Sequence, residues 1–253
     1  MKPIVVHPRM DFMLYAMDPI VNQAAKWSYM FGGQTSPQVT IRGIINRGGE
    51  QGAQHSQALH SWFAHIPGLK VVLPSSVSDA RDLLIASVLS KNPVIYIDDR
   101  WLYDQEDHLP VACDIDLDNI SPKIIYEGNS ITLVGCGYST LLLKNISQKL
   151  IQNKISPEII DLRIINPFNH KIISDSVEKT GRLFVLDGGW GPCGISAEVI
   201  ASVSENINPK HLKSQPKRLT IPFTPAPTSK DLESKYYPSE EKVFQEILKI
   251  FKN

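Results

Sequence analysis

The chain has 253 residues, with 26 Lys and Arg against 26 Asp and Glu, so its formal net charge is zero. A hydrophobic content of 42% is ordinary for a soluble globular protein and allows one or two domains. Only residues 210–218 form a dense basic cluster, with five cationic groups that include His211, and this segment reads as a loop. The charge balance therefore argues against binding to nucleic acid or to an anionic membrane.

Cysteine usage and the first residues indicate a cytoplasmic protein. The cysteines, Cys113, Cys136 and Cys193, are widely spaced, which suggests neither a disulfide framework nor a zinc site. The opening stretch MKPIVVHPRMDF lacks the pattern of a secretion signal. No apolar run approaches the roughly 20 residues that a membrane span requires, so we expect no membrane partner.

The first half of the chain alternates strand and helix patterns. We expect strands at 3–6, 39–45, 69–74 and 92–98. Helices are expected at 12–29, ending at Gly32 and Gly33, at about 57–65, and at 79–90, where nearby serines offer N-caps. Parallel strands need long crossovers and helices supply them, so the alternation predicts a parallel sheet covered on both faces.

Residues 104–122 differ in composition, since they hold six acidic residues, two prolines and no Lys or Arg. We interpret this stretch as containing an interdomain linker and expect a first domain at 1–112, a linker at 113–123 and a second domain at 124–253. In the second domain we expect strands at 130–137, 155–163 and 182–189, and helices at 139–153, 194–203 and about 239–251. The proline-rich part of 209–238 is expected to be irregular. The predicted fold is thus two doubly wound α/β domains.

A glycine-rich cluster, GGEQGAQHSQ at 48–57, lies where a strand gives way to a helix. Ligands bind at the carboxyl ends of parallel strands, and His55 is the side chain of this segment that titrates near neutral pH. His55 is thus a candidate acid, base or orienting group. A helix-capping loop with a hydrogen-bonded surface histidine explains the same spacing equally well.

A second cluster, DGGWGPCG at 187–194, also joins a strand to a helix. Its amides could bind an anion, although a packing or subunit-interface loop is the favoured interpretation. The sequence contains no dinucleotide-binding GxGxxG, Walker, GxSxG or HExxH motif in the required context. Phe12 by composition reads as a core aromatic, and Asp18 and Asn22 are polar positions one helical turn apart that could hydrogen-bond each other or a partner subunit.

Longer stretches resemble one known family. DPIVNQAAKWSYMFGGQ, GAQHSQALHSWFAHIPGLKVV, ITLVGCG, IIDLRIINPF and FVLDGGWGPCGISAEVIA follow one another in this chain. In that order they resemble the beta subunits of thiamine-diphosphate-dependent 2-oxo acid dehydrogenases of the pyruvate, branched-chain and acetoin types. The resemblance implies a transketolase-like pyrimidine-binding domain followed by a transketolase C-terminal-like domain.

The family's functional residues carry over at a few positions. Phe12 matches the aromatic residue that packs on the cofactor's aminopyrimidine ring, which replaces its interpretation as a core residue. His55 matches the histidine proposed to orient the lipoyl group and to manage protons. Tyr15 stands where relatives often have Gln, and the resemblance implies that it contacts the cofactor or an intermediate. A structural potassium ion, bound through backbone carbonyls in some members, would lie at Val39, Ser87, Val88 and Asn92.

Two family features have no counterpart in this sequence. The family's activating glutamate lies upstream of the matched region, so the resemblance implies an N-terminally truncated or split beta subunit. The motif that holds Mg²⁺ and the diphosphate belongs to the alpha subunit. The resemblance therefore implies an alpha partner, a second copy of the chain and a lipoyl-bearing acyltransferase.

The expected function is decarboxylation of a pyruvate-like 2-oxo acid and transfer of the acyl group to lipoamide, in complex with the alpha subunit. Two alternatives stay open. One is a two-component transketolase-like enzyme of sugar or polysaccharide biosynthesis. The other is a non-catalytic assembly remnant that lacks the activating glutamate.

Overall fold

The fold is taken from a computed structural model that describes residues 1–252. The described chain divides into two compact units. Unit 1 comprises residues 1–120, 163–168 and 225–229, and unit 2 comprises 121–162, 169–224 and 230–253, of which all but the last residue is described. No helix of the described part is long and apolar enough to cross a membrane.

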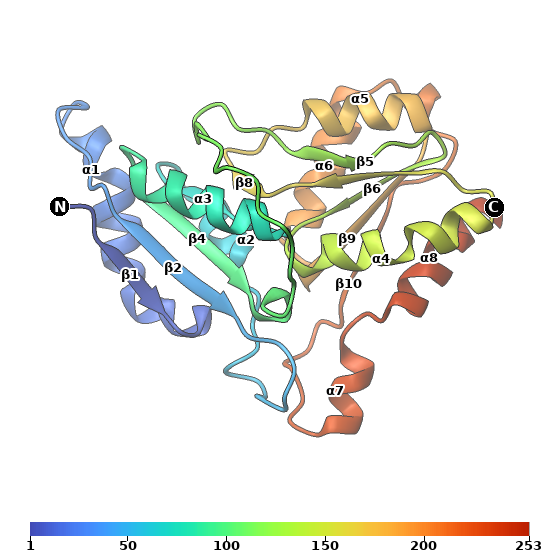
Figure 1. Cartoon of the computed structure of the whole chain (residues 1–253), viewed down its shortest axis with the longest axis horizontal. Coiled ribbons are helices and arrows are strands. Elements are labelled where there is room, and N and C mark those ends of the chain that lie inside the picture. Colours follow the sequence, from blue (N-terminus) through green and yellow to red (C-terminus); the bar gives the residue numbers. More distant parts are fainter. Residues whose placement is uncertain (253) are drawn as a thin grey trace. The chain divides into compact units, whose positions relative to one another are not determined.

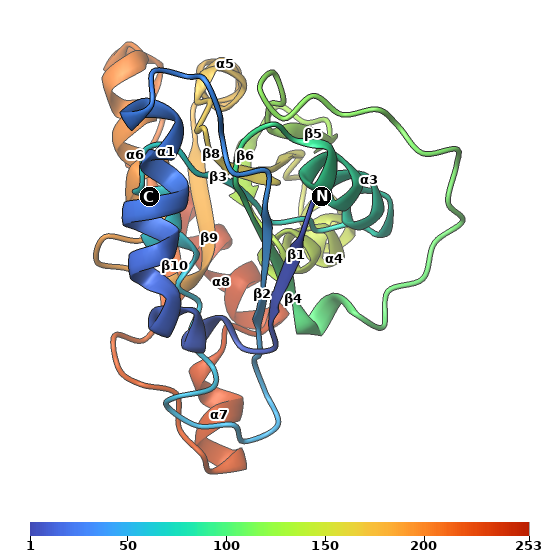
Figure 2. The ribbon, with the colours of Figure 1, turned by 90° about the vertical axis from the view of Figure 1, so that its left-hand side faces the viewer.

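Unit 1 is built on a five-stranded sheet with the order β1-β2-β4-β3-β8. The first four strands are parallel and β8 pairs antiparallel with β3, which the sequence pattern did not anticipate. Helices α1 and α3 lie on opposite sides of this sheet (Figure 2), so the doubly wound arrangement is confirmed here. The strands are β1 (Ile4–His7), β2 (Thr40–Ile45), β3 (Lys70–Val72), β4 (Val94–Asp99) and β8 (Ile164–Asn166); the helices are η1 (Met10–Ala16), η2 (Pro19–Ala24), α1 (Ala25–Met30), α2 (His60–Ala64), α3 (Val77–Leu89) and η3 (Arg100–Leu102).

The segment expected as one helix over 12–29 is three consecutive helical pieces. It begins as a 3₁₀ helix (η1), continues as a π-helix (η2) that has Pro19 at its first position, and becomes α-helical only at Ala25. Proline has no N–H to donate, which interrupts the regular hydrogen-bond ladder at this point. The helix ends as expected at Gly32 and Gly33, both with positive φ, and Gly33 N donates to Ser28 O at 2.7 Å.

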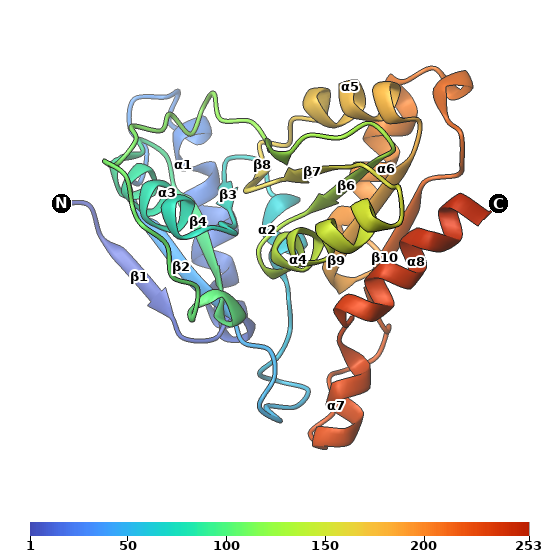
Figure 3. The same ribbon diagram turned by 45° about the vertical axis from the view of Figure 1, so that its right-hand side comes forward.

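Unit 2 is built on a second five-stranded sheet with the order β10-β9-β6-β7-β5. Helices α4 and α8 pack together on one of its faces (Figure 3), where Leu143, Ile146, Phe244 and Ile247 join the core. The strands are β5 (Lys123–Tyr126), β6 (Ile131–Gly135), β7 (Pro157–Asp161), β9 (Leu183–Trp190) and β10 (Lys217–Ile221); the helices are α4 (Tyr138–Gln152), α5 (Lys171–Thr180), α6 (Ile195–Asn206), η4 (Pro209–His211), α7 (Lys230–Tyr236) and α8 (Glu240–Lys252).

Several elements of unit 2 go beyond the sequence-based expectation. The proline-rich stretch before the last helix was expected to be irregular, yet it contains β10 and α7. Strand β10 pairs parallel with β9 (Figure 1), and β5 pairs antiparallel with β7 at the other edge of the sheet. Short strands between prolines carry too weak a periodic pattern to be recognised without their neighbours.

Candidate functional site

Phe12 and His55 come together in unit 1 beyond the carboxyl ends of adjacent parallel strands. Phe12 lies in η1, directly after β1, and His55 lies in the loop that follows β2. Their ring centroids are 5.2 Å apart at an interplanar angle of 67°, an edge-to-face contact. The fold therefore unites two of the residues singled out in the sequence, 43 positions apart, as the strand-end rule requires.

A buried carboxylate ties the two segments together. Asp11 is 4% exposed, and its Oδ1 accepts a hydrogen bond from the backbone N–H of Gln57 at 3.0 Å. Burial raises the pKa of Asp11 above its ordinary value, while the bond from Gln57 and the nearby His55 partly oppose that rise. Sequence reasoning missed Asp11, because nothing local distinguishes it from a surface aspartate.

A pocket of about 340 Å³ opens beside this carboxylate and is lined by Asp11, Phe12, Leu14, Tyr15, Gln54 and Gln57. Phe12 is 40% exposed, so part of its ring is accessible, and Tyr15 is 92% exposed. A flat apolar face bordered by amide side chains suits a heteroaromatic ring, which stacks on the face and hydrogen-bonds at its edges. Phe12 and Tyr15, the two residues predicted to hold the cofactor, thus line one pocket.

An ion pair and a closely packed glycine stabilise the loop between β2 and His55. Arg47 Nη2 lies 2.8 Å from Asp99 Oδ2, and both side chains are almost fully buried. Gly48 has a φ of +74°, and a Cβ there would lie 2.8 Å from Trp101 Nε1. A side chain at position 48 would be strained in conformation and would collide with the indole, so the loop needs glycine.

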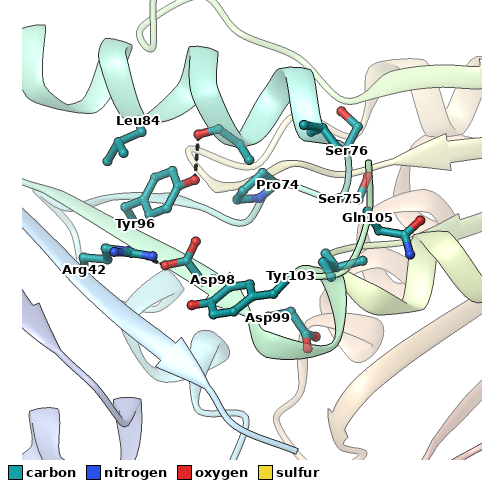
Figure 4. A pocket seen from close by; sticks show the side chains of 13 residues that line it. Arg42, Pro74, Ser75, Ser76, Leu84, Tyr96, Asp98, Asp99, Tyr103 and Gln105 are labelled. Atoms are coloured by element: carbon teal, nitrogen blue, oxygen red, sulfur yellow. Dashed lines mark hydrogen bonds and ion pairs between the residues drawn. The ribbon is translucent and has the colours of Figure 1, made fainter. Parts of the chain in front are cut away.

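A second pocket, of about 330 Å³, lies along the α3 side of β2 and β4 (Figure 4). Arg42 points at Asp98 and hydrogen-bonds it through Nε, and the Tyr96 hydroxyl donates to Ala80 O at 2.8 Å. Burial raises the pKa of Asp98, although the Arg42 guanidinium opposes that shift. Arg42 and Asp98 cancel in charge, and the other carboxylate of the lining, Asp99, is paired with Arg47.

The four backbone positions suggested for potassium lie near the amino-terminal ends of β2 and β4 and on α3. The carbonyl of Val39 accepts from Val94 N at 3.0 Å, and that of Asn92 accepts from Ser90 Oγ at 3.0 Å. Lys2 Nζ donates to Leu89 O at 2.8 Å, so an ammonium group already lies at the carboxyl end of α3. No group of three or more His, Cys, Asp or Glu able to hold a metal occurs in residues 1–252.

The glycine-rich loop at 187–194 is held by internal hydrogen bonds within unit 2. The fully buried Asp187 accepts from Gly189 N at 2.8 Å through Oδ1 and from Ser196 N at 3.1 Å through Oδ2. Trp190 Nε1 donates to Thr224 O at 3.0 Å. Asp187 therefore already accepts hydrogen bonds from backbone amides that an anion at the start of α6 would need. This favours the packing interpretation of the loop.

Comparison with known proteins gives matches over both units. Residues 1–105 match the family model of the transketolase pyrimidine-binding domain, and residues 122–243 match that of the transketolase C-terminal domain. The beta subunit of acetoin:2,6-dichlorophenolindophenol oxidoreductase from Cupriavidus necator is 36% identical over 96% of this chain and 71% of its own length. The pyruvate dehydrogenase E1 component subunit beta from Rickettsia bellii is 35% identical over 99% of this chain and 76% of its own.

The chain belongs to this family of beta subunits. It is a beta subunit of a thiamine-diphosphate-dependent 2-oxo acid dehydrogenase, with the oxidoreductase chemistry of that family. The fold has a solved counterpart in a split gene transketolase described as an inactive beta4 tetramer, with a TM-score of 0.78, 16% identity, and coverage of 99% of this chain and 76% of that one. The family resemblance and the fold class expected from the sequence are both confirmed.

Proposed function

We propose that this beta subunit provides the pyrimidine-binding half of a thiamine diphosphate site that an alpha subunit completes, and that the complex decarboxylates a pyruvate-like 2-oxo acid. The observation that carries the proposal is the contact of Phe12 with His55 beside the pocket that Phe12 and Tyr15 line. The relative named pyruvate dehydrogenase supports a 2-oxo acid as the substrate.

Phe12 fits the cofactor's ring on physical grounds. Its partly exposed face borders a cavity of about 340 Å³, which leaves room for one small aromatic ring among the side chains of Gln54 and Gln57. Thiamine diphosphate, once bound, supplies the electron sink that stabilises the negative charge left when carbon dioxide departs. The task of Phe12 is to hold the ring while the amide side chains hydrogen-bond its edge.

His55 is proposed to manage protons and to orient the lipoyl group that accepts the acyl fragment. The imidazole of His55 makes an edge-to-face contact with the Phe12 ring. It therefore lies next to the pocket that Phe12 lines, and it is not itself one of the lining residues. Asp11 accepts a hydrogen bond from the backbone of Gln57, two residues after His55, and thereby restrains the loop that carries His55. An imidazole has one ring nitrogen that can donate a proton and one that can accept it, which suits this role.

The remaining partners follow from the family. An alpha subunit would hold Mg²⁺ and the diphosphate, a second copy of this chain would complete the assembly, and a lipoyl-bearing acyltransferase would receive the acyl group in the cytoplasm. The carbonyls of Val39, Ser87, Val88 and Asn92 are proposed for potassium. Two of these carbonyls already accept hydrogen bonds, but a carbonyl oxygen has a second lone pair available for a cation.

The test is thiamine diphosphate binding by the chain reconstituted with an alpha subunit of the same type, measured by calorimetry. Phe12→Ala should weaken binding about tenfold, or about 1.4 kcal/mol, since the stacking face is lost. Phe31→Ala is the matched control, because Phe31 is similarly exposed but lies at the end of α1. Equal binding by the Phe12 variant and the wild type would refute the proposed site.

The same complex tests His55 by its balance of products. His55→Ala should reduce transfer of the acyl group to lipoamide more than it reduces carbon dioxide release. Loss of both to the same extent would remove its proposed role in acyl transfer.

A further inference from the structure

A concave, strongly basic site lies in unit 2, outside the region of Phe12 and His55. It is a cavity of about 550 Å³ bounded by the loop at 213–215, strand β10 and the second half of α8. Its basic lining residues are Lys213, Lys217, Arg218 and Lys249. The first three belong to the cluster that the sequence marked as unusual, and the fold adds Lys249 from a helix more than 30 positions further on.

The positive charge of this cavity is largely uncompensated. Glu246 is the one acidic residue of its lining, and it pairs with Lys249 at 2.5 Å. Four cations against one carboxylate leave a local charge of three, in a chain whose formal net charge is zero. The concentration of charge is therefore a property of this site, since overall composition does not require it.

The other cations contact only neutral groups. Lys213 Nζ donates to Thr180 O at 3.1 Å, and Arg218 Nη1 donates to Gly191 O at 2.8 Å. Lys217 has no hydrogen-bond or ion-pair partner within residues 1–252. Carbonyl contacts orient the Lys213 and Arg218 side chains without neutralising them, and each keeps further N–H donors for a ligand.

Edge protection alone does not account for this arrangement. Strand β10 is the edge of its sheet, and lysine on an edge strand commonly discourages pairing with another chain. Here, however, the cations surround a hollow that also has buried Phe184 and Ile250 in its wall, and one cation comes from α8. A cavity of this volume lies within the usual range of small-molecule sites, roughly 300–1,000 Å³.

We propose that this cavity binds a small, multiply charged anion, specifically a molecule that carries a diphosphate or two phosphoryl groups. The lysines supply compact point charges, and Arg218 supplies several N–H donors from its guanidinium group. Both kinds of side chain suit phosphate oxygens. A single carboxylate would leave most of the local charge unmatched. The site lies on the C-terminal family domain, so it adds a ligand to the proposed function and does not depend on it.

The test is calorimetric titration of the full chain with inorganic diphosphate and, separately, with inorganic phosphate, at low ionic strength. Diphosphate should bind more tightly than phosphate, and added salt should weaken both. The double variant Lys217→Gln, Arg218→Gln should weaken diphosphate binding by about tenfold or more, since two of the uncompensated charges are lost.

Matched variants distinguish binding in this cavity from a general attraction of anions to surface lysines. Lys144→Gln is the control for the single variant Lys217→Gln: it removes one lysine charge at an exposed position of α4 outside the cavity and should leave diphosphate binding within about twofold of wild type. The proposal is overturned if diphosphate does not bind or if Lys144→Gln weakens binding as much as the double variant does.

Discussion

Asp11 shows how much one buried side chain contributes to the candidate site. It is a neighbour of Phe12 in sequence, and its Oδ1 holds the Gln57 amide 46 positions away. Its other oxygen, Oδ2, is buried and has no hydrogen-bond partner within the described residues. Ionising a buried carboxyl group costs free energy, and this cost is the physical reason for the raised pKa of Asp11.

The raised pKa of Asp11 predicts a pH-dependent difference between the wild type and Asp11→Asn. Between its ordinary value of 3.8 and its raised value, the folded chain binds more protons than the unfolded chain, so this group lowers stability as pH rises through that window. Asp11→Asn should therefore gain stability relative to the wild type over the same window. Urea unfolding at a series of pH values measures the difference, and a constant difference at every pH would contradict the prediction.

At the scale of elements, β1 is an edge strand with little protection. Ile4, Val5 and Val6 are each between 43% and 49% exposed, although they alternate between the faces of the sheet. Strands of a parallel sheet are normally covered on both faces. An apolar edge strand of this kind is open to pairing with another chain.

This exposure predicts that a charge on β1 reduces self-association of the isolated chain. Val5→Lys should shift the chain toward the monomer in light scattering or sedimentation, because a lysine on an edge disfavours strand pairing. The secondary structure should change little, since the side chain is already half exposed. Val71→Lys, in the fully buried β3, should instead unfold unit 1. Unchanged association of the Val5 variant would show that another surface governs it.

At the scale of the whole molecule, the chain returns to unit 1 after entering unit 2. Strand β8 pairs with β3, Leu73 N donates to Arg163 O at 2.9 Å, and Arg163 Nη1 lies 3.0 Å from Asp79 Oδ1. Unit 1 is thus discontinuous in sequence. The two units cannot be separated by a single cut without removing β8 from its sheet.

We therefore expect the fragment 1–120 to be markedly less stable than the same unit in the full chain. Its β3 edge would lose the backbone hydrogen bonds and the apolar cover that Ile164 provides. The control is the full chain cleaved once within the exposed stretch 104–111, which keeps β8 in the molecule. Thermal unfolding should show a lower midpoint for the fragment than for the cleaved chain, and equal midpoints would contradict a stabilising role of β8.

Hydrophobic periodicity determined the fold class, because it is a local pattern. The GAQHSQ segment marked His55 as a candidate, and the family resemblance added Phe12. The Asp18–Asn22 hydrogen bond, 2.7 Å long, followed from helical spacing in the same way. The tertiary structure alone decided that Asp11 meets Gln57, that Arg47 pairs with Asp99, that β8 joins the first sheet, and that Lys249 joins Lys217. These contacts depend on strand register and on the path of the chain, and no local spacing encodes either.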